Sequence, residues 1–134
     1  MALGEAMIVA GIGCRSGVSA TEVDAAIAAA LREHGVTEAE LGLIAIPHSK
    51  AQECGIIEAA AARRIHIELI SQQALEAASK HALTRSARAL AAMNVDSVAE
   101  AAALAGAGIN PRLLGPRAAV GPVTCALAEG AIHS

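Results

Sequence analysis

A glycine-rich loop follows the first apolar run of the chain, and it carries residues suited to binding an anion. The run Met7–Ala10 leads into Gly11-Ile-Gly-Cys-Arg-Ser-Gly17. Glycines let the backbone come close to a ligand, and free N–H groups at a helix start favour negative charge. Arg15 adds a forked donor that suits a carboxylate or a phosphate. Because the spacing fails the dinucleotide fingerprint and lacks a phosphate-loop lysine, a tight turn with a solvated arginine stays open as the alternative.

Two later segments each place a carboxylate beside other polar groups. Ser49-Lys50-x-x-Glu53 puts a cation and a carboxylate on one helix face, with Lys50 suited to an anionic ligand and Glu53 to general-base work. A surface ion pair is the competing interpretation. Ser97-x-x-Glu100 is above all a helix cap. That cap still matters for function, because it fixes a helix end that would face the same cleft.

The cysteines and histidines give weaker signals. Cys14, Cys54 and Cys125 are an odd number without short pairing, which indicates reduced thiols in a cytoplasm. Cys14 lies near a predicted helix start, where a thiol can be acidified, but no spacing pairs it with a base, so a small buried cysteine is the competing interpretation. The histidines show no metal-ligand spacing and no Gly-x-Ser-x-Gly elbow occurs. We therefore expect no metal, no cofactor and no standard hydrolase triad.

The elements that must position these residues alternate along the chain. Apolar or alternating runs predict strands at 7–10, 43–46, 65–69 and 123–128, and a further strand at 118–120 is left open inside a turn-rich connection over 111–122. Capping signals predict helices after Ser19, Ser71 and Ser97 and a short turn after Thr37, and another helix runs through about Arg64. Residues 81–94 fit either a helix or a loop.

This alternation predicts an α/β fold, a three-layer sandwich with helices on both faces of a mostly parallel or mixed sheet of about five strands. A chain of 134 residues makes one domain, 1–134. Ligands in such sheets lie at the carboxyl ends of strands. The loops 11–19, 47–53 and 94–100 are therefore expected to meet.

Composition excludes several classes of protein. A net charge of −3 argues against a general nucleic-acid binder, and the absence of Phe, Trp and Tyr excludes base-stacking platforms and aromatic cages. The longest apolar run, 101–109, is far shorter than the roughly twenty residues that span a bilayer. The start of the chain lacks the basic residues of a signal peptide. We expect a cytoplasmic protein without membrane or nucleic-acid partners, and its alanine-rich helix faces are compatible with a homo-oligomer.

Four stretches, taken in order, carry a resemblance to a known family: Val9–Ser19, Ser49–Gly55, Ser97–Leu104 and Thr124–Ala128. In them the chain resembles the CobE family of cobalamin biosynthesis, which matches the C-terminal domain of CbiG. The Gly-Ile-Gly-Cys-Arg loop and the Ser-Val-x-Glu-x-Ala-x-Leu helix are together its specific part. The chain looks like the free-standing form of the family.

The resemblance implies a role in building the corrin ring. The two-part relative is a hydrolase that opens a lactone on a ring-A acetate of a cobalt-precorrin and releases acetaldehyde. For this chain the resemblance implies a protein that binds or processes a precorrin, with other cobalamin-pathway enzymes as further partners. Arg15, Lys50 and helix N-termini suit the precorrin carboxylates. In a lactone-opening site Glu53 or Glu100 would be the base, and the glycine loop would hold the oxyanion.

The candidate site therefore has two groups of residues. The catalytic candidates are Glu53 and Glu100, and the substrate-binding candidates are Gly11, Gly13, Cys14, Arg15, Ser19, Ser49, Lys50, Ser97 and Thr124. Three functions stay open: a precorrin-processing, hydrolase-like enzyme; a non-catalytic binder or carrier of pathway intermediates; and a phosphate- or nucleotide-binding module. The missing aromatics and phosphate-loop lysine count against the third.

Overall fold

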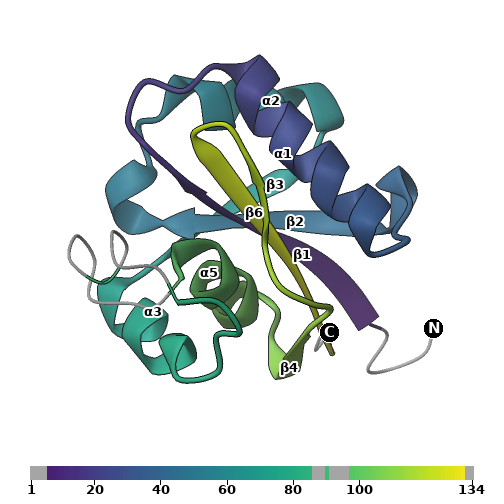
Figure 1. Cartoon of the computed structure of the whole chain (residues 1–134), viewed down its shortest axis with the longest axis vertical. Coiled ribbons are helices and arrows are strands. Elements are labelled where there is room, and N and C mark those ends of the chain that lie inside the picture. Colours follow the sequence, from purple (N-terminus) through teal and green to yellow (C-terminus); the bar gives the residue numbers. More distant parts are fainter. Residues whose placement is uncertain (1–5, 86–89, 91–96, 132–134) are drawn as a thin grey trace.

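The computed structural model describes residues 6–85, 90 and 97–131 (Figure 1). In chain order the elements are β1 (Ala6–Cys14), α1 (Ala20–Glu33), η1 (Glu38–Glu40), β2 (Leu41–Pro47), η2 (His48–Lys50), α2 (Cys54–Arg63), β3 (His66–Ile70), α3 (Gln72–Ser79), α5 (Val98–Gly106), β4 (Ile109–Leu113), β5 (Ala118–Val120) and β6 (Val123–Ala131).

The strands form one mixed sheet in the order β3-β2-β1-β6-β4, with β5 also paired to β6. β2 runs parallel to both β1 and β3, whereas β6 is antiparallel to β1, β4 and β5. The α/β fold class is confirmed, and of the two kinds of sheet expected the structure has the mixed one. The parallel strands β1, β2 and β3 lead into helices α1, α2 and α3 respectively.

Helices cover both faces of the sheet (Figure 1). Helices α1 and α2 pack on one face, where Ile12, Ile27 and Ile44 are fully or almost fully buried. Helices α3 and α5 pack on the other, over a core made largely of alanine, with Val9 and Leu75 among its larger members. Successive residues of β1 serve opposite faces, as the two-residue period of a strand requires. These layers are the three-layer arrangement expected from the sequence.

The strand β4 was not predicted, because its segment reads as turn-rich. Pro111 lies inside it, Asn110 has a φ of +52°, and the pairing with β6 shifts register between Ile109 and Arg112. Proline has no N–H to give to a ladder, so it is tolerated in a strand at a sheet edge or a bulge. β4 is such an edge strand, and it brings the sheet to six strands instead of about five.

The capping signals fixed the helix starts correctly. Ser19 Oγ accepts the Glu22 N–H at 3.1 Å, and Glu22 Oε1 accepts the Ser19 N–H at 3.0 Å, a complete capping box. Ser71 Oγ likewise accepts the Ala74 N–H at 3.1 Å at the start of α3. Helix α1 gives way to Gly35, whose φ of +65° suits glycine.

The ambiguous segment 81–94 lies mostly outside the described residues. Of its described residues, 81–85 belong to neither a helix nor a strand, and Leu90 is helical. Residues 94–96 of the expected third loop also lie outside the description, so that loop is represented here by 97–100. Within the described ranges, no helix is long and apolar enough to cross a membrane.

Candidate functional site

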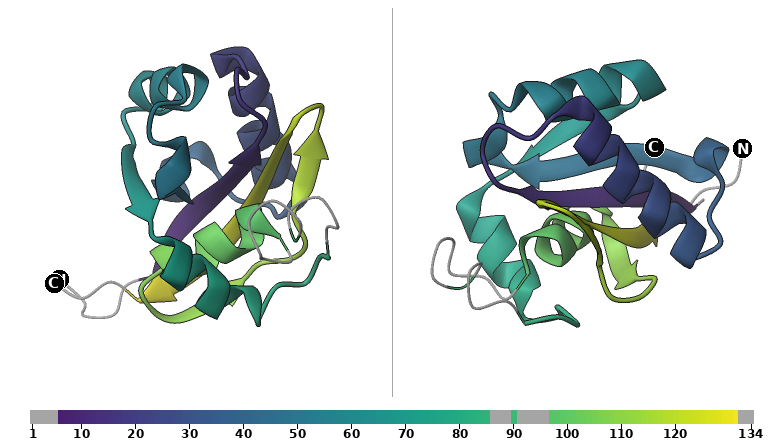
Figure 2. Two further views of the ribbon diagram at one scale, coloured as in Figure 1. Left: turned by 90° about the vertical axis from the view of Figure 1, so that its left-hand side faces the viewer. Right: turned by 45° about the horizontal axis from the view of Figure 1, so that its top comes forward.

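The loops that follow β1 and β2 meet at one edge of the sheet (Figure 2). The Gly17 N–H donates to Glu53 Oε1 at 3.0 Å across 36 residues of sequence. Lys50 Nζ donates to Ser16 Oγ at 3.4 Å. Because β1 and β2 are parallel, their carboxyl ends lie side by side. The first loop is shorter than expected, because residues 11–14 belong to β1. Its remainder, 15–19, meets the loop after β2.

The start of helix α5 packs against the same end of β1. A Cβ atom on Gly11 would lie 2.1 Å from the Ala99 carbonyl oxygen, and one on Gly13 would lie 2.7 Å from Thr124 Oγ1. The Thr124 hydroxyl donates to the Gly13 carbonyl at 3.2 Å. Gly11 thus gives helix α5 its close approach to β1, and Gly13 leaves room for the Thr124 side chain of β6. The first turn of α5, which includes Ala99, is brought beside the loop that carries Arg15.

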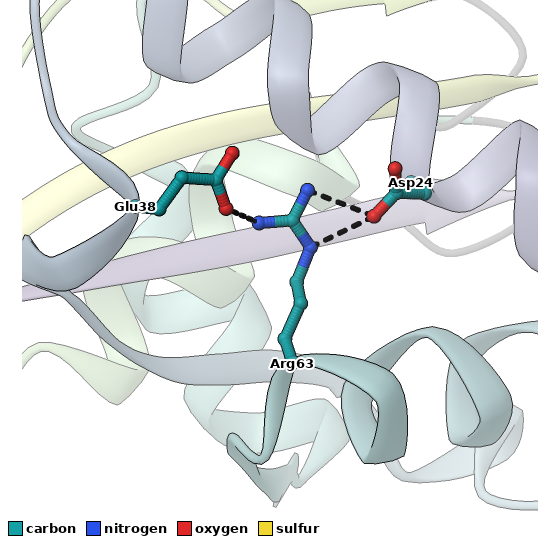
Figure 3. Close-up of polar contacts among 3 residues, drawn as sticks. All are labelled: Asp24, Glu38 and Arg63. Atoms are coloured by element: carbon teal, nitrogen blue, oxygen red, sulfur yellow. Dashed lines mark hydrogen bonds and ion pairs between the residues drawn. The ribbon is translucent and has the colours of Figure 1, made fainter.

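Two cations at this edge have no carboxylate partner among the described residues. Arg15 is exposed and Lys50 is partly exposed, and the Lys50 ammonium group donates a hydrogen bond to a serine hydroxyl. Arg63 provides the contrast. Its Nη2 lies 2.8 Å from Asp24 Oδ1, and its Nη1 also pairs with Glu38 (Figure 3). Arg15 and Lys50 can therefore receive an anionic ligand without first breaking an ion pair.

Glu53 is a half-buried carboxylate between these loops. It is the N-cap residue of α2, but its side chain makes no capping hydrogen bond there. Oε1 accepts the Gly17 N–H, and Oε2 has no hydrogen-bond partner within the described residues. A carboxylate with one oxygen held and the other open is suited to take a proton from water or from a ligand.

Cys14, the last residue of β1, lies within electrostatic reach of both Lys50 and Glu53. Burial raises the pKa of its thiol; Lys50 lowers that pKa, and Glu53 raises it. The thiol is therefore protonated at neutral pH, and the acidification that a helix start can give is outweighed. Cys54 and Cys125 are also free thiols, and burial raises the pKa of Cys125 to about 12.

The Glu100 side chain is fully buried, and its carboxylate accepts several hydrogen bonds. Oε1 accepts the N–H groups of Leu83 and Thr84 at 2.7 and 2.8 Å. Oε2 accepts the Thr84 hydroxyl at 2.6 Å and the Arg117 N–H at 2.9 Å. Sequence reasoning missed these partners, because Leu83 and Thr84 lie in the ambiguous segment and Arg117 in the turn-rich one. No local spacing signals such contacts.

Of the three candidate serines, two cap helices and one is exposed. Ser97 is buried and caps α5 through the Glu100 N–H at 3.4 Å, while Ser19 caps α1. Ser49 is exposed in η2, beside Lys50. No group of three or more His, Cys, Asp or Glu side chains that could hold a metal ion occurs in the part of the chain that the structure describes.

Comparisons with known proteins agree with this architecture. Residues 8–128 match the family model described as the cobalamin synthesis G C-terminus. The crystal structure of CobE, a protein from the cobalamin biosynthetic pathway, is 34% identical with a TM-score of 0.90, over 100% of this chain and 97% of that one.

A second solved structure, the cobalamin biosynthesis protein chiG from Agrobacterium tumefaciens, is 38% identical with a TM-score of 0.71, over 91% of this chain and 97% of that one. No curated protein sequence matches significantly. The family model covers nearly the whole chain, and the resemblance seen in the sequence is confirmed. The chain belongs to the cobalamin synthesis G C-terminal family of cobalamin biosynthesis proteins.

Proposed function

We propose that this protein binds a precorrin at the edge where the loops after β1 and β2 meet, and that it acts in the cytoplasm during construction of the corrin ring. The observation that carries the proposal is the joining of the two loops by the Gly17–Glu53 and Lys50–Ser16 contacts. This joining brings the segments of Arg15 and Lys50 together, and neither side chain has a carboxylate partner among the described residues.

The chemistry of a precorrin suits this edge. Its acetate and propionate carboxylates need forked or point-charge donors, which Arg15 and Lys50 provide. The net charge of −3 means that attraction is local rather than general. Because the chain has no aromatic residue, the macrocycle would rest on aliphatic side chains and glycine backbone.

The finer form of the proposal is hydrolysis of a ring-A lactone. Glu53, through its open Oε2, would take a proton from a water molecule as the water oxygen bonds to the lactone carbonyl carbon. The ring C–O bond would then break, and the proton would pass from Glu53 to the departing alkoxide. Backbone N–H groups of the loop after β1 would stabilise the oxyanion. The products are a hydroxyl group and a carboxylic acid, which loses its proton to solvent at neutral pH, and the lactone ring is open.

A non-catalytic carrier is the second candidate. Its support is that Glu53 is the one open carboxylate of the two proposed bases, since Glu100 is buried and accepts four hydrogen bonds. A carrier would use the same two cations and leave the ligand unchanged.

The test mixes the protein with a precorrin that carries the ring-A lactone and follows both its absorption spectrum and its mass. A hydrolase converts an excess of ligand, and Glu53→Gln binds without converting. A carrier gives a stoichiometric spectral shift and an unchanged mass. Arg32→Gln is the matched control, because Arg32 is exposed in the last turn of α1, away from the site. No spectral shift at any ratio would overturn both forms.

A further inference from the structure

Glu100 ties the first turn of α5 to two segments that are distant in sequence. Its carboxylate accepts the N–H groups of Leu83, Thr84 and Arg117 and the Thr84 hydroxyl, and none of its side chain is exposed. A buried carboxylate is costly unless every oxygen is satisfied. The donors that satisfy the Glu100 carboxylate come from two segments, which lie 16 and 17 residues away in the sequence.

One of these contacts fixes the backbone of a third arginine near the site. Arg117 immediately precedes β5, whose Ala119 pairs with Thr124 of β6. Thr124 in turn donates to the carbonyl of Gly13 near the end of β1. The segment of Arg117 is therefore linked to the end of β1 through the ladder from β5 to β6, and to the first turn of α5 through Glu100.

The Arg117 side chain is partly exposed and makes no hydrogen bond or ion pair with the described part of the chain. The paired arginines, Arg63 and Arg112, each have a carboxylate partner. An arginine whose backbone N–H is held, and whose guanidinium has no partner among the described residues, loses little freedom when it binds a carboxylate.

We infer that Arg117 is a third ligand-binding cation of this site and that Glu100 is the positioning residue that holds it there. The inference rests on the proposed function and adds to it a third cation and the residue that positions that cation. A ligand with carboxylates around its rim would contact Arg15 and Lys50 on one side of the start of α5 and Arg117 on the other. The ligand class is a tetrapyrrole with acidic side chains on several rings.

The test measures the affinity for uroporphyrin, a stable tetrapyrrole with an acetate and a propionate on every ring, by the fluorescence of the porphyrin. Arg117→Gln is expected to weaken binding about 10-fold, because a charge-assisted hydrogen bond is lost. Arg117→Lys is expected to recover part of that loss. Neither variant should move the thermal unfolding midpoint. Arg32→Gln should bind as the wild type does.

Glu100→Gln tests the positioning role, since the amide replaces one acceptor oxygen by a donor that faces N–H groups. It is expected to weaken uroporphyrin binding, and the weakening should largely disappear when Arg117 is already Gln, because coupled residues are not additive. If Glu100→Gln does not fold, the Arg117 variants still decide the matter.

The outcomes separate this inference from the proposed function. If Arg15→Gln weakens uroporphyrin binding while Arg117→Gln leaves it unchanged, the role of Arg117 is overturned and the proposed function stands. Wild-type protein that fails to bind uroporphyrin at any concentration would overturn both.

Discussion

Glu53 and Glu100 are both glutamates at the start of a helix, and both helices begin near the carboxyl end of β1. The surroundings of the two carboxylates nevertheless differ completely. Glu53 is half-buried and accepts one hydrogen bond, from Gly17. Glu100 is fully buried and accepts four, from two distant segments. The difference shows that burial and the number of donors, rather than residue type or spacing, decide whether a carboxylate is open to a ligand or holds the structure together.

The largest effect should come from removing the buried carboxylate. We expect Glu100→Ala to destabilise the fold by at least about 3 kcal/mol, because three backbone N–H groups and one hydroxyl lose the buried carboxylate that accepts from them. Glu53→Ala should cost less than about 1 kcal/mol, since its hydrogen bond is partly exposed. Denaturant unfolding followed by far-ultraviolet circular dichroism measures both. Equal losses for the two variants would remove the contrast drawn between them.

A second effect concerns the glycines that admit helix α5. Gly11→Ala would place a Cβ against the backbone of α5 at Ala99 and should cost about 2–3 kcal/mol. Gly17→Ala meets no atom within 4 Å and is strained only by its φ of +84°, so about 1 kcal/mol is expected. The same unfolding experiment applies. A Gly11→Ala protein as stable as Gly17→Ala would mean that α5 can move away from β1 at little cost.

The helix caps should give a smaller change. Ser97→Ala should lower stability by about 1 kcal/mol through the lost cap on the Glu100 N–H, and Ser19→Ala should lose a similar amount from α1. The two differ in consequence, because Ser97 caps the helix that carries Glu100. Only Ser97→Ala should also weaken the binding of uroporphyrin, and an equal loss of binding in both variants would contradict this.

The smallest effect is a change in thiol reactivity at Cys14. Its pKa is raised by burial, so alkylation should be slow at neutral pH and should reach its full rate only at a higher pH than for an ordinary cysteine. Lys50 lowers this pKa and Glu53 raises it, so Lys50→Gln should slow alkylation further and Glu53→Gln should accelerate it. The rate is read by mass spectrometry at Cys14 against pH. Faster alkylation in Lys50→Gln, or slower alkylation in Glu53→Gln, would show that these two charges do not act on the Cys14 thiol as described.

The same raised pKa has a consequence for stability. The folded state keeps the Cys14 proton to a higher pH than the unfolded chain does, so this thiol contributes stability below the unfolded pKa. That contribution is lost as pH rises through the folded pKa. Cys125, with its pKa raised to about 12 by burial, acts in the same direction.

Local patterns were predictable from the sequence, and contacts between distant segments were not. The Ser19 box marked the start of α1 because both of its hydrogen bonds join residues three apart. The edge strand β4 was missed because Pro111 and the positive φ of Asn110 break the strand pattern, and only pairing with β6 restores it.

The two candidate bases show the same limit. Their spacing was visible in the sequence, and the meeting of the loops after β1 and β2 followed from the parallel order of these strands. The partners of Glu53 and Glu100 lie 16 to 36 residues away, so tertiary structure alone distinguishes an open carboxylate from a buried one.

The central claim is that an acid-rich tetrapyrrole binds where the loops after β1 and β2 meet the start of α5. The most direct measurement is the amide NMR spectrum of the protein during titration with uroporphyrin. We predict that the amide signals of Gly13, Gly17 and Ala99 shift in proportion to occupancy, while that of Gly42, near the amino end of β2, stays in place. Shifts confined to Gly42 and its neighbours, with the other three unmoved, would contradict the claim.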